Sequence, residues 1–357
     1  MNRNYNLNEK EIIKEILVVG KFPPPIGGVT IHTRRLVELL ERGSYQVSLI
    51  NIRCIRRLLS NCMRIKKVTC KSSIVHYQLN NWLELFFLSK LVSCSLVTTV
   101  HSFRWDRFSL VKRMAFKSLV SHNDISAFIA PSLTIKKLLM DKGVKESIIY
   151  VIPTYLPPVY DEIYQAIPED IYNFLIKNKN KKKCILASAS SIVIENNVDI
   201  YGLDMCISVC ERNKDLSFVF CAAQGNELYI ERMKQRIQDS NMSGRFLLYI
   251  GDIYLPSLYR YFDLFVRPTS TDSYGISVEE AIQSGIKAIA SDVCERAKGA
   301  FIFKARNLND FESKIFEALN CQEESFEIKE EQSYLRTYIL LYDNLLKNNI
   351  TNLAGSE

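Results

Sequence analysis

The chain has 357 residues, of which 47% are hydrophobic and 24% charged, with only 13 glycines and 10 prolines. This composition excludes a disordered, collagenous or low-complexity protein, and the length predicts two domains, each with its own core. None of the ten cysteines shows zinc-site spacing, and several lie within apolar runs, as small hydrophobic residues do. The N-terminal segment is polar and does not resemble a secretory signal, so we expect a reducing cytoplasm.

The formal net charge of +7 is divided unevenly along the chain. Residues 1–150 hold 24 Lys and Arg against 10 Asp and Glu (+14), whereas residues 151–357 hold 22 against 29 (−7). Seven basic residues and no acid occur from Arg53 to Lys71, and the apolar segment NWLELFFLSKL (81–91) follows. This pattern predicts a surface that lies on an anionic bilayer, with a solvated face beside a core helix as the alternative. We expect no nucleic-acid partner, because the second half is acidic and no nucleic-acid motif occurs.

The stretch 82–100 has the length of a membrane span. It contains Glu84 and Lys90, and a charge near the centre of a span costs about 2.5–3.5 kcal/mol. We therefore expect a helix followed by a short buried strand.

Short β-rich runs alternate with longer helical patterns in both halves. The first half predicts strands at 15–20, 46–51, 73–77, 96–100, 126–130 and 149–152, with helices at 28–42, 82–92, 108–121 and 132–142. The second half predicts strands at 184–188, 216–221, 246–250, 263–267, 286–290 and 300–303, with helices at 199–212, 226–240, 255–262, 276–284 and 309–319. A last helix is predicted at 330–348. This alternation indicates two doubly wound α/β domains with parallel sheets, in which ligands bind beyond the carboxyl ends of the strands.

Several common catalytic motifs are absent from the sequence. There is no G-x-G-x-x-G, no G-x-x-x-x-G-K-[ST], no H-E-x-x-H, no G-x-S-x-G and no D-x-D. Dehydrogenases, P-loop NTPases, zinc proteases of the H-E-x-x-H type and serine hydrolases with the nucleophile elbow are therefore disfavoured.

Candidate site residues remain at the strand ends. Gly27-Gly28 opens a helix just after the first strand, where backbone amides favour an anion such as phosphate, although an ordinary turn is the alternative. His101 ends the strand LVTTV and faces the ligand side of the sheet, where a structural hydrogen bond is the simpler role. In DLFVRPTSTDSYGISVEEAIQSG, Asp272 and Glu280 frame a helix start. Asp272 also suits a turn, and Ser277-x-x-Glu280 also suits a capping box.

Together these segments resemble family 4 of the retaining glycosyltransferases, which have the GT-B fold. The residues that carry the resemblance are PPIGGVTIHTRRL, TTVHS, APSLTIKKLLMDKGV with IYVIPTYLPP, and RPTSTDSYGISVEEAIQSG with its acid-x7-Glu frame. The resemblance covers about 15–345, including a final helix that crosses back to the first domain. It implies an acceptor-side domain at 1–153, a linker at 154–183, a donor-binding domain at 184–329, and a crossover helix with its tail at 330–357.

The resemblance also implies roles for particular residues. His101 would contact the transferred sugar, Asp272 would bind sugar hydroxyls where the family usually has Glu, and Glu280 would hold the ribose. The remaining donor-binding set would be Gly27 and Gly28 near the diphosphate, Ile253 along the nucleobase, and Gly275, Ile276 and Ser277 with amides toward the sugar or the phosphates.

One departure from the family is marked. An Arg and a Lys usually follow the first strand of the second domain and neutralise the diphosphate, but ASASSIVIENNVDIYGLDMC (187–206) contains no basic residue and carries Glu195 and Asp199. Arg267, Lys21 or helix amides would have to replace them, and Arg267 joins the expected donor-binding set.

The function implied is metal-independent, front-face transfer of a hexose or N-acetylhexosamine from a nucleotide sugar, UDP-linked, to a lipid-linked or growing surface glycan such as O-antigen, capsule or exopolysaccharide. No cofactor beyond the donor is expected, and the location implied is the inner face of the plasma membrane, as a peripheral protein. A catalytically silent assembly partner at the membrane is the alternative, motivated by the missing basic pair. An epimerase on the same fold is a third interpretation.

Overall fold

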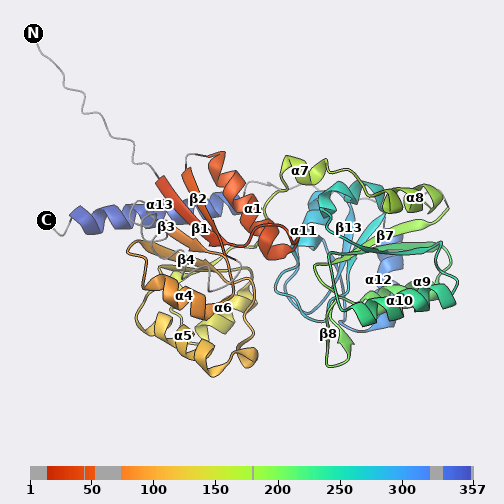
Figure 1. Ribbon diagram of the computed structural model, residues 1–357, viewed down its shortest axis with the longest axis horizontal. Helices are drawn as coiled ribbons and strands as arrows, with labels where there is room; N and C mark the ends of the chain where they lie inside the picture. Colours follow the sequence, from red (N-terminus) through yellow and green to blue (C-terminus); the bar gives the residue numbers. More distant parts are fainter. Residues whose placement is uncertain (1–13, 44, 53–73, 179–180, 322–332, 355–357) are drawn as a thin grey trace, which may run out of the picture.

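The computed structural model describes residues 14–43, 45–52, 74–178, 181–321 and 333–354. The basic segment from Arg53 to Lys71, for which membrane contact was predicted, lies outside these residues. Within them the chain forms two six-stranded parallel sheets with helices on their faces, as the alternation of strands and helices predicts. The two sheets stand side by side in Figure 1, the first on the left and the second on the right.

The first sheet has the strand order β2-β1-β3-β4-β5-β6. Its strands are β1 (Lys14–Gly20), β2 (Tyr45–Asn51), β3 (Ile74–Tyr77), β4 (Ser95–Thr99), β5 (Ala127–Ala130) and β6 (Ile149–Val151). The helices of this half are α1 (Gly28–Glu41), α4 (Trp82–Ser89), α5 (Leu110–Ser121) and α6 (Leu133–Met140), with short 3-10 turns η1 (Trp105–Arg107) and η2 (Glu146–Ile148).

The second sheet has the order β11-β10-β7-β12-β13-β14. Its strands are β7 (Lys183–Ala189), β10 (Leu216–Ala222), β11 (Phe246–Ile250), β12 (Leu264–Arg267), β13 (Lys287–Ser291) and β14 (Phe301–Phe303). The helices beside it are α9 (Leu203–Arg212), α10 (Glu227–Asp239), α11 (Ile276–Gln283) and α12 (Leu308–Asn320). Both sheets reverse their strand order at the first strand of the domain, which places a crevice at the carboxyl ends there.

The stretch 82–100 is the expected helix and buried strand, α4 and β4. No helix in the described ranges is long and apolar enough to cross a membrane. In the segment 81–91, Trp82, Leu85 and Leu88 are buried in the core of the first domain. Leu83, Phe86 and Leu91 are half-buried, and Phe87 is exposed. Bilayer contact by this segment stays a prediction.

Four local predictions need correction. The helix expected at 255–262 is two 3-10 turns, η3 (Leu255–Ser257) and η4 (Tyr259–Tyr261). The helix expected from 199 begins only at α9, after a small hairpin of β8 (Ile194–Glu195) and β9 (Val198–Asp199). The stretch expected as a linker contains α7 (Tyr160–Ile163) and α8 (Glu169–Asn178). The last helix, α13 (Ser333–Ala354), extends further than its predicted end.

Helix α13 returns to the first domain, as expected, and completes its core. Tyr338, Leu341 and Tyr342 are buried there against β-strand residues such as Ile16 and Val97. Figure 1 shows α13 beside the first sheet, far from α12, the helix that precedes it in the second domain. The first domain is therefore built from both ends of the chain.

Candidate active site

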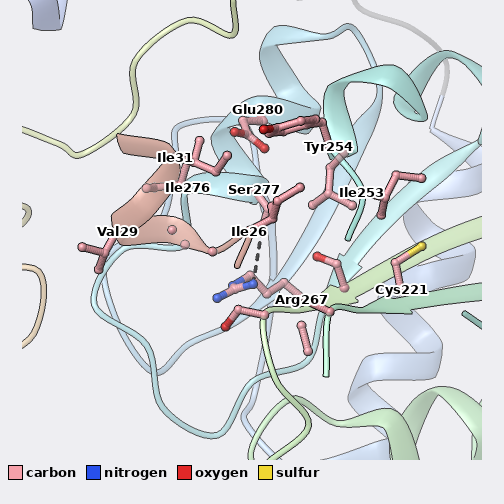
Figure 2. Close-up of a pocket in the computed structure, with 18 of the residues that line it drawn as sticks. Ile26, Val29, Ile31, Cys221, Ile253, Tyr254, Arg267, Ile276, Ser277 and Glu280 are labelled. Carbon is pink, nitrogen blue, oxygen red and sulfur yellow. Dashed lines mark hydrogen bonds between the residues drawn. The ribbon is translucent and has the colours of Figure 1, made fainter. Parts of the chain in front are cut away.

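One cavity collects all ten residues predicted for the site. It lies between the carboxyl ends of the two sheets, and residues of both domains line it (Figure 2). The predicted residues in its lining are Gly27, Gly28, His101, Ile253, Arg267, Asp272, Gly275, Ile276, Ser277 and Glu280. The roles given to them remain predictions, but their convergence follows from the fold, because parallel strands end at one edge of each sheet.

Two helix N-termini, one from each domain, meet in this cavity. Gly27 caps α1 and Gly275 caps α11, and a Cβ added at Gly28 would lie 3.7 Å from Ile276 Cδ1. Gly275 has φ +82°, and a Cβ there would lie 2.5 Å from Arg296 Nη1, so only glycine fits. The first turns of two helices point their amides and positive dipole ends at one space, which favours an anion.

The capping box that was the alternative interpretation of Ser277 and Glu280 is not formed. The N-cap of α11 is Gly275, so Ser277 lies inside the helix. Its hydroxyl accepts a hydrogen bond from Arg267 Nη1 at 3.2 Å, in the contact drawn in Figure 2. Neither Ser277 nor Glu280 is therefore used to cap this helix.

Asp272 is held by two arginines. Its Oδ2 accepts from Arg267 Nε at 2.6 Å and from Arg296 Nη1 at 2.8 Å, and its Oδ1 accepts from the Ser273 amide. Burial alone would raise the pKa of Asp272, but attraction to the two guanidiniums lowers it well below the usual range. Because arginine stays protonated, this cluster carries a net charge of +1 beside the cavity. We call Arg267, Asp272 and Arg296 the cationic cluster.

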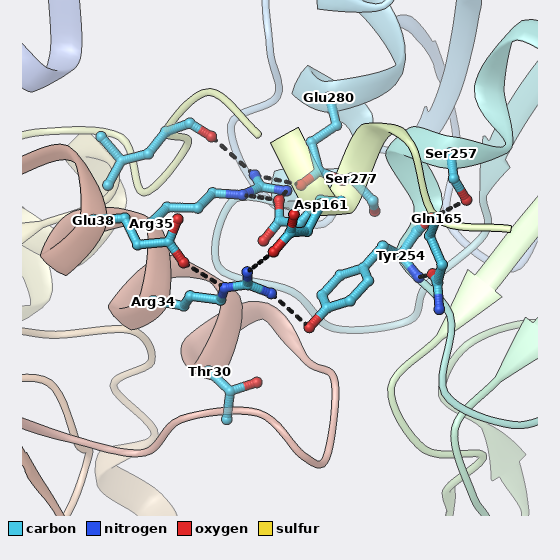
Figure 3. A network of polar contacts seen from close by, with 12 residues as sticks. Thr30, Arg34, Arg35, Glu38, Asp161, Gln165, Tyr254, Ser257, Ser277 and Glu280 are labelled. Atoms are coloured by element: carbon cyan, nitrogen blue, oxygen red, sulfur yellow. Dashed lines mark hydrogen bonds and ion pairs between the residues drawn. The ribbon is translucent and has the colours of Figure 1, made fainter. Parts of the chain in front are cut away.

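Glu280 belongs to a second cluster, which crosses between the domains (Figure 3). Arg35 of α1 donates from Nη1 to Glu280 Oε1 at 2.6 Å and from Nη2 to Glu162 Oε2 of α7 at 2.6 Å. All three side chains are at most 6% exposed. Tyr259 donates to the other Glu280 oxygen at 3.1 Å. One cation faces two carboxylates, and we call Arg35, Glu162 and Glu280 the anionic cluster.

Glu162 is the member of the anionic cluster that has an unsatisfied carboxylate oxygen. Its Oε1 has no hydrogen-bond partner among the described residues although it is buried. Burial raises the pKa of Glu162, and the neighbouring carboxylate of Glu280 raises it further against the opposing effect of Arg35. The pKa of Glu162 is therefore raised in the anionic cluster, while the pKa of Asp272 is lowered in the cationic cluster.

His101 is placed by a chain of buried polar groups. Its Nε2 lies 2.9 Å from Gln78 Oε1, and the Gln78 amide nitrogen lies 3.0 Å from His76 Nε2. Tyr342 of α13 contacts His76 Nδ1 at 2.6 Å. These contacts assign the proton of His101 to Nε2. Burial, together with His32 and His76 nearby, lowers the pKa of His101 well below its usual value, so the imidazole is neutral.

The acids found where the family carries its basic pair have other partners. Glu195 receives a two-pronged pair from Arg107 of the first domain, at 2.8 and 2.7 Å. Asp199 is buried and accepts from the amides of Tyr201 and Gly202 before α9. Neither Glu195 nor Asp199 lines the cavity. Of the two cations predicted to replace the basic pair, Arg267 lines the cavity and Lys21 does not.

Three further residues of the site were not foreseen from the sequence: Arg35, Glu162 and Arg296. Arg35 interrupts the apolar face of α1, between Ile31 and Leu36, and a buried-side arginine is the signal that would have drawn attention to it. Arg296 and Glu162 stand in no recognisable motif. Among the described residues no group of three or more His, Cys, Asp or Glu is placed to hold a metal ion.

Comparison with known proteins agrees with this arrangement. Residues 173–333, from α8 through the second sheet, match the family model described as glycosyl transferases group 1. The chain finds no match among curated proteins. Structures with a similar fold include HepE from Anabaena in complex with UDP and glucose (13% identity, TM-score 0.65, covering 96% of this chain and 100% of that one).

Two more structures extend the comparison. A glycosyltransferase from Rickettsia africae shares 16% identity with a TM-score of 0.65, covering 95% of this chain and 97% of that one. Sucrose-phosphate synthase from Thermosynechococcus elongatus shares 15% with a TM-score of 0.63, covering 96% and 100%. At such identities the likeness establishes the fold, which is the two-domain GT-B arrangement. With the group 1 match over the second domain, it supports a glycosyltransferase.

Proposed function

We propose that the protein is a retaining glycosyltransferase that moves a hexose or N-acetylhexosamine from a UDP-linked donor to a lipid-linked or growing surface glycan. The observation that carries the proposal is the cationic cluster beside two converging helix N-termini, in a cavity that His101 and Glu280 also line. The UDP complexes of HepE support a UDP donor on this fold.

The diphosphate of the donor binds between Gly27-Gly28, the α11 N-terminus and Arg267 in this proposal. Arg267 takes the place of the missing basic pair, since its side chain lines the cavity. Its Nε and Nη1 are bonded to Asp272 and Ser277, and they orient the guanidinium. Glu280 accepts hydrogen bonds from the ribose hydroxyls, and Ile253 lies along the base.

Transfer then breaks the bond from the sugar C1 to the phosphate oxygen. The acceptor hydroxyl attacks the same face of C1, and its proton passes to the departing phosphate oxygen, so UDP leaves and the anomeric configuration is kept. The cationic cluster and helix amides stabilise the charge that develops on the diphosphate, without a metal ion. His101, neutral and fixed by Gln78, offers its unprotonated Nδ1 to a sugar hydroxyl.

The test is calorimetric titration of the purified protein with UDP, GDP and a panel of their sugars. We expect one nucleotide sugar to bind, with the affinity lost in Glu280→Ala and Asp272→Ala. Glu231→Ala, on the exposed face of α10, is the matched control and should bind as the wild type does. NMR of the product anomer checks retention, and an inverted product would contradict it.

A silent assembly partner is the second candidate. The structure favours it in one respect, because both site carboxylates are already paired with arginines. This candidate predicts no nucleotide-sugar binding at millimolar ligand, and cellular glycan unchanged by Asp272→Ala and Glu280→Ala. Binding of any donor sugar that these variants abolish would exclude it.

A further inference from the structure

Three of the four histidines of the chain are buried together in the first domain. They are His32 of α1, His76 of β3 and His101, which follows β4, and the ring centroids of His32 and His101 are 5.2 Å apart. Burial lowers the pKa of all three, so each ring is neutral and carries its single proton on one of two nitrogens. Of the three, His101 alone lines the cavity.

Hydrogen bonds join His101 to the last helix through two buried residues. Gln78 lies between the two rings, with its Oε1 at 2.9 Å from His101 Nε2 and its Nε2 at 3.0 Å from His76 Nε2. On the far side of His76, Nδ1 lies 2.6 Å from the hydroxyl of Tyr342 on α13. Gln78 and Tyr342 are both fully buried.

The protons of these groups follow one order. Because the Gln78 amide has its oxygen at His101, the His101 ring donates from Nε2. Because the amide nitrogen faces His76, that ring accepts at Nε2 and carries its proton on Nδ1, where the Tyr342 oxygen accepts it. Reversing the Gln78 amide would move the proton of both rings to the other nitrogen. The tautomer of His101 is thus tied to a hydroxyl on α13.

The order of protons decides what His101 offers to a ligand. Its Nδ1 has no hydrogen-bond partner among the described residues, and the side chain lines the cavity. With the proton held on Nε2, Nδ1 accepts a hydrogen bond and cannot donate one. A sugar hydroxyl, which has a proton to donate, is a suitable partner.

We propose that Gln78 and Tyr342 are positioning residues that hold His101 in the tautomer protonated on Nε2 and fix the orientation of its ring. Gln78 acts directly, and Tyr342 acts through His76. Neither Gln78 nor Tyr342 lines the cavity, so neither contacts the donor. The step in which Nδ1 receives a hydroxyl of the transferred sugar rests on the proposed function. The tautomer itself is a property of the first domain with α13 and is measured without any substrate.

The first experiment is nitrogen NMR of the full chain with isotope-labelled histidine, which separates protonated from unprotonated ring nitrogens. The His101 signals are identified by their absence from His101→Gln. We expect the wild type to carry the proton of His101 on Nε2 and that of His76 on Nδ1. Gln78→Leu removes the acceptor of the Nε2 proton, so the proton of His101 should move to Nδ1, where water in the cavity accepts it.

Tyr342→Phe tests the distant end of the same chain of hydrogen bonds. It leaves the Nδ1 proton of His76 buried without an acceptor, which is costly. That proton should move to Nε2 and reverse the Gln78 amide, so that the tautomer of His101 inverts although its own contact is unaltered. A proton on Nδ1 of His101 in the wild type would overturn the proposal, whether or not the variants fold. An unchanged tautomer in Gln78→Leu would also overturn it, and an unchanged tautomer in Tyr342→Phe would overturn the role of α13.

Tyr45→Phe is the matched control for Tyr342→Phe. The Tyr45 ring is buried against the same helix, 6.1 Å from the Tyr342 ring, and its hydroxyl donates to Asp343 Oδ1 at 2.8 Å. The variant therefore loses a phenol hydrogen bond to α13 outside the chain that reaches His101. Its His101 tautomer should be that of the wild type. Inversion in this control would mean that any disturbance of α13 has the same effect.

Titration and turnover separate a positioning role from a merely structural one. Gln78→Leu should keep wild-type affinity for UDP, which has no sugar to meet His101, while the turnover number falls about tenfold because the ring is no longer held. Equal losses of UDP affinity and turnover would make the role of Gln78 structural. A wild type that binds no nucleotide sugar would contradict the proposed function, whereas the NMR result would still decide the tautomer.

Discussion

The anionic and cationic clusters each contribute two residues to the lining of one cavity, and their charge balances are opposite. Arg35 stands between Glu162 and Glu280, one cation for two carboxylates, whereas Asp272 stands between two arginines. The first joins α1, α7 and α11 across the domains, and the second lies wholly within the second domain. A surplus of carboxylate suits ligand hydroxyls and a surplus of guanidinium suits phosphate. The proposed function therefore assigns the donor's hydroxyls to the anionic cluster and its phosphates to the cationic cluster.

The largest expected effect comes from removing the single cation of the anionic cluster. Arg35→Met leaves Glu162 and Glu280 buried without their partner, which should lower the free energy of unfolding by about 3–5 kcal/mol. Urea denaturation measures it. Arg212→Met, which breaks the exposed pair with Glu312, is the control and should cost less than about 1 kcal/mol. Equal losses of unfolding free energy in the two variants would mean that the buried cluster stabilises the protein no more than an exposed ion pair does.

Removing the lining cation of the second cluster should affect phosphate binding most. Arg267→Gln should lower the turnover number by about 10²–10³-fold, as loss of a donor to a developing negative charge does. Its affinity for UDP should fall while its affinity for uridine stays. Arg296→Gln breaks the same Asp272 cluster without touching the cavity lining, so its affinity for UDP should fall less. Equal losses would place the phosphate contact elsewhere.

The complementary variant should affect the hydroxyls. Glu280→Gln weakens hydrogen bonds to a charged acceptor, which contribute about 1.5–3 kcal/mol each, so uridine and UDP should both bind more weakly, by the same factor. Glu162→Gln disturbs the same Arg35 pairing but does not line the cavity. Its affinity for uridine should be unchanged. A loss for UDP alone in Glu280→Gln would assign this carboxylate to the phosphates.

The smallest effects are two opposite slopes of stability against pH. The pKa of Asp272 is depressed on folding, so its stabilisation is present above its unfolded pKa and is lost as pH falls toward the folded one. The pKa of Glu162 is raised, so its contribution is full below the unfolded pKa and is lost as pH rises through the folded value. Urea unfolding over a pH series measures both.

One variant tests each pH dependence. Glu162→Gln should remove the decrease in the free energy of unfolding that Glu162 causes as pH rises. The stability of this variant relative to the wild type should therefore increase from acid to neutral pH. For Asp272→Asn the free energy of unfolding relative to the wild type should decrease over the same change in pH. Parallel profiles for the two variants would refute the charge contrast between the clusters.

The sequence predicts the fold well because the strands are continuous apolar runs with helices between them. It also predicts that the ten site residues share one cavity, since they lie at or beyond the carboxyl ends of strands, in the loops and helices that follow. The sequence does not predict the partners of those residues. Arg35 meets Glu280, and Asp272 meets Arg296, only because the chain folds. No local pattern in the sequence specifies such long-range pairs.

Local signals also fail where two principles compete. Ser277 and Glu280 have capping-box spacing, but Gly275 is the N-cap, in a left-handed conformation that favours glycine. Its missing Cβ also leaves room for Arg296 Nη1. The run 255–262 has helical composition, yet it forms two 3-10 turns, with Leu258 and Tyr259 buried. Glu195, which counts against phosphate binding in the sequence, is used by Arg107 across the domains.

The return of α13 to the first sheet matters for the order in which the protein is made. Tyr342, near the end of the chain, contacts His76 Nδ1, and Tyr338 lies 3.3 Å from His32 Nε2. During synthesis the second domain has all of its strands before these tyrosines leave the ribosome. Of the two domains, the one translated first is thus completed last, and His76 and His32 acquire these two partners only after the second sheet has been made.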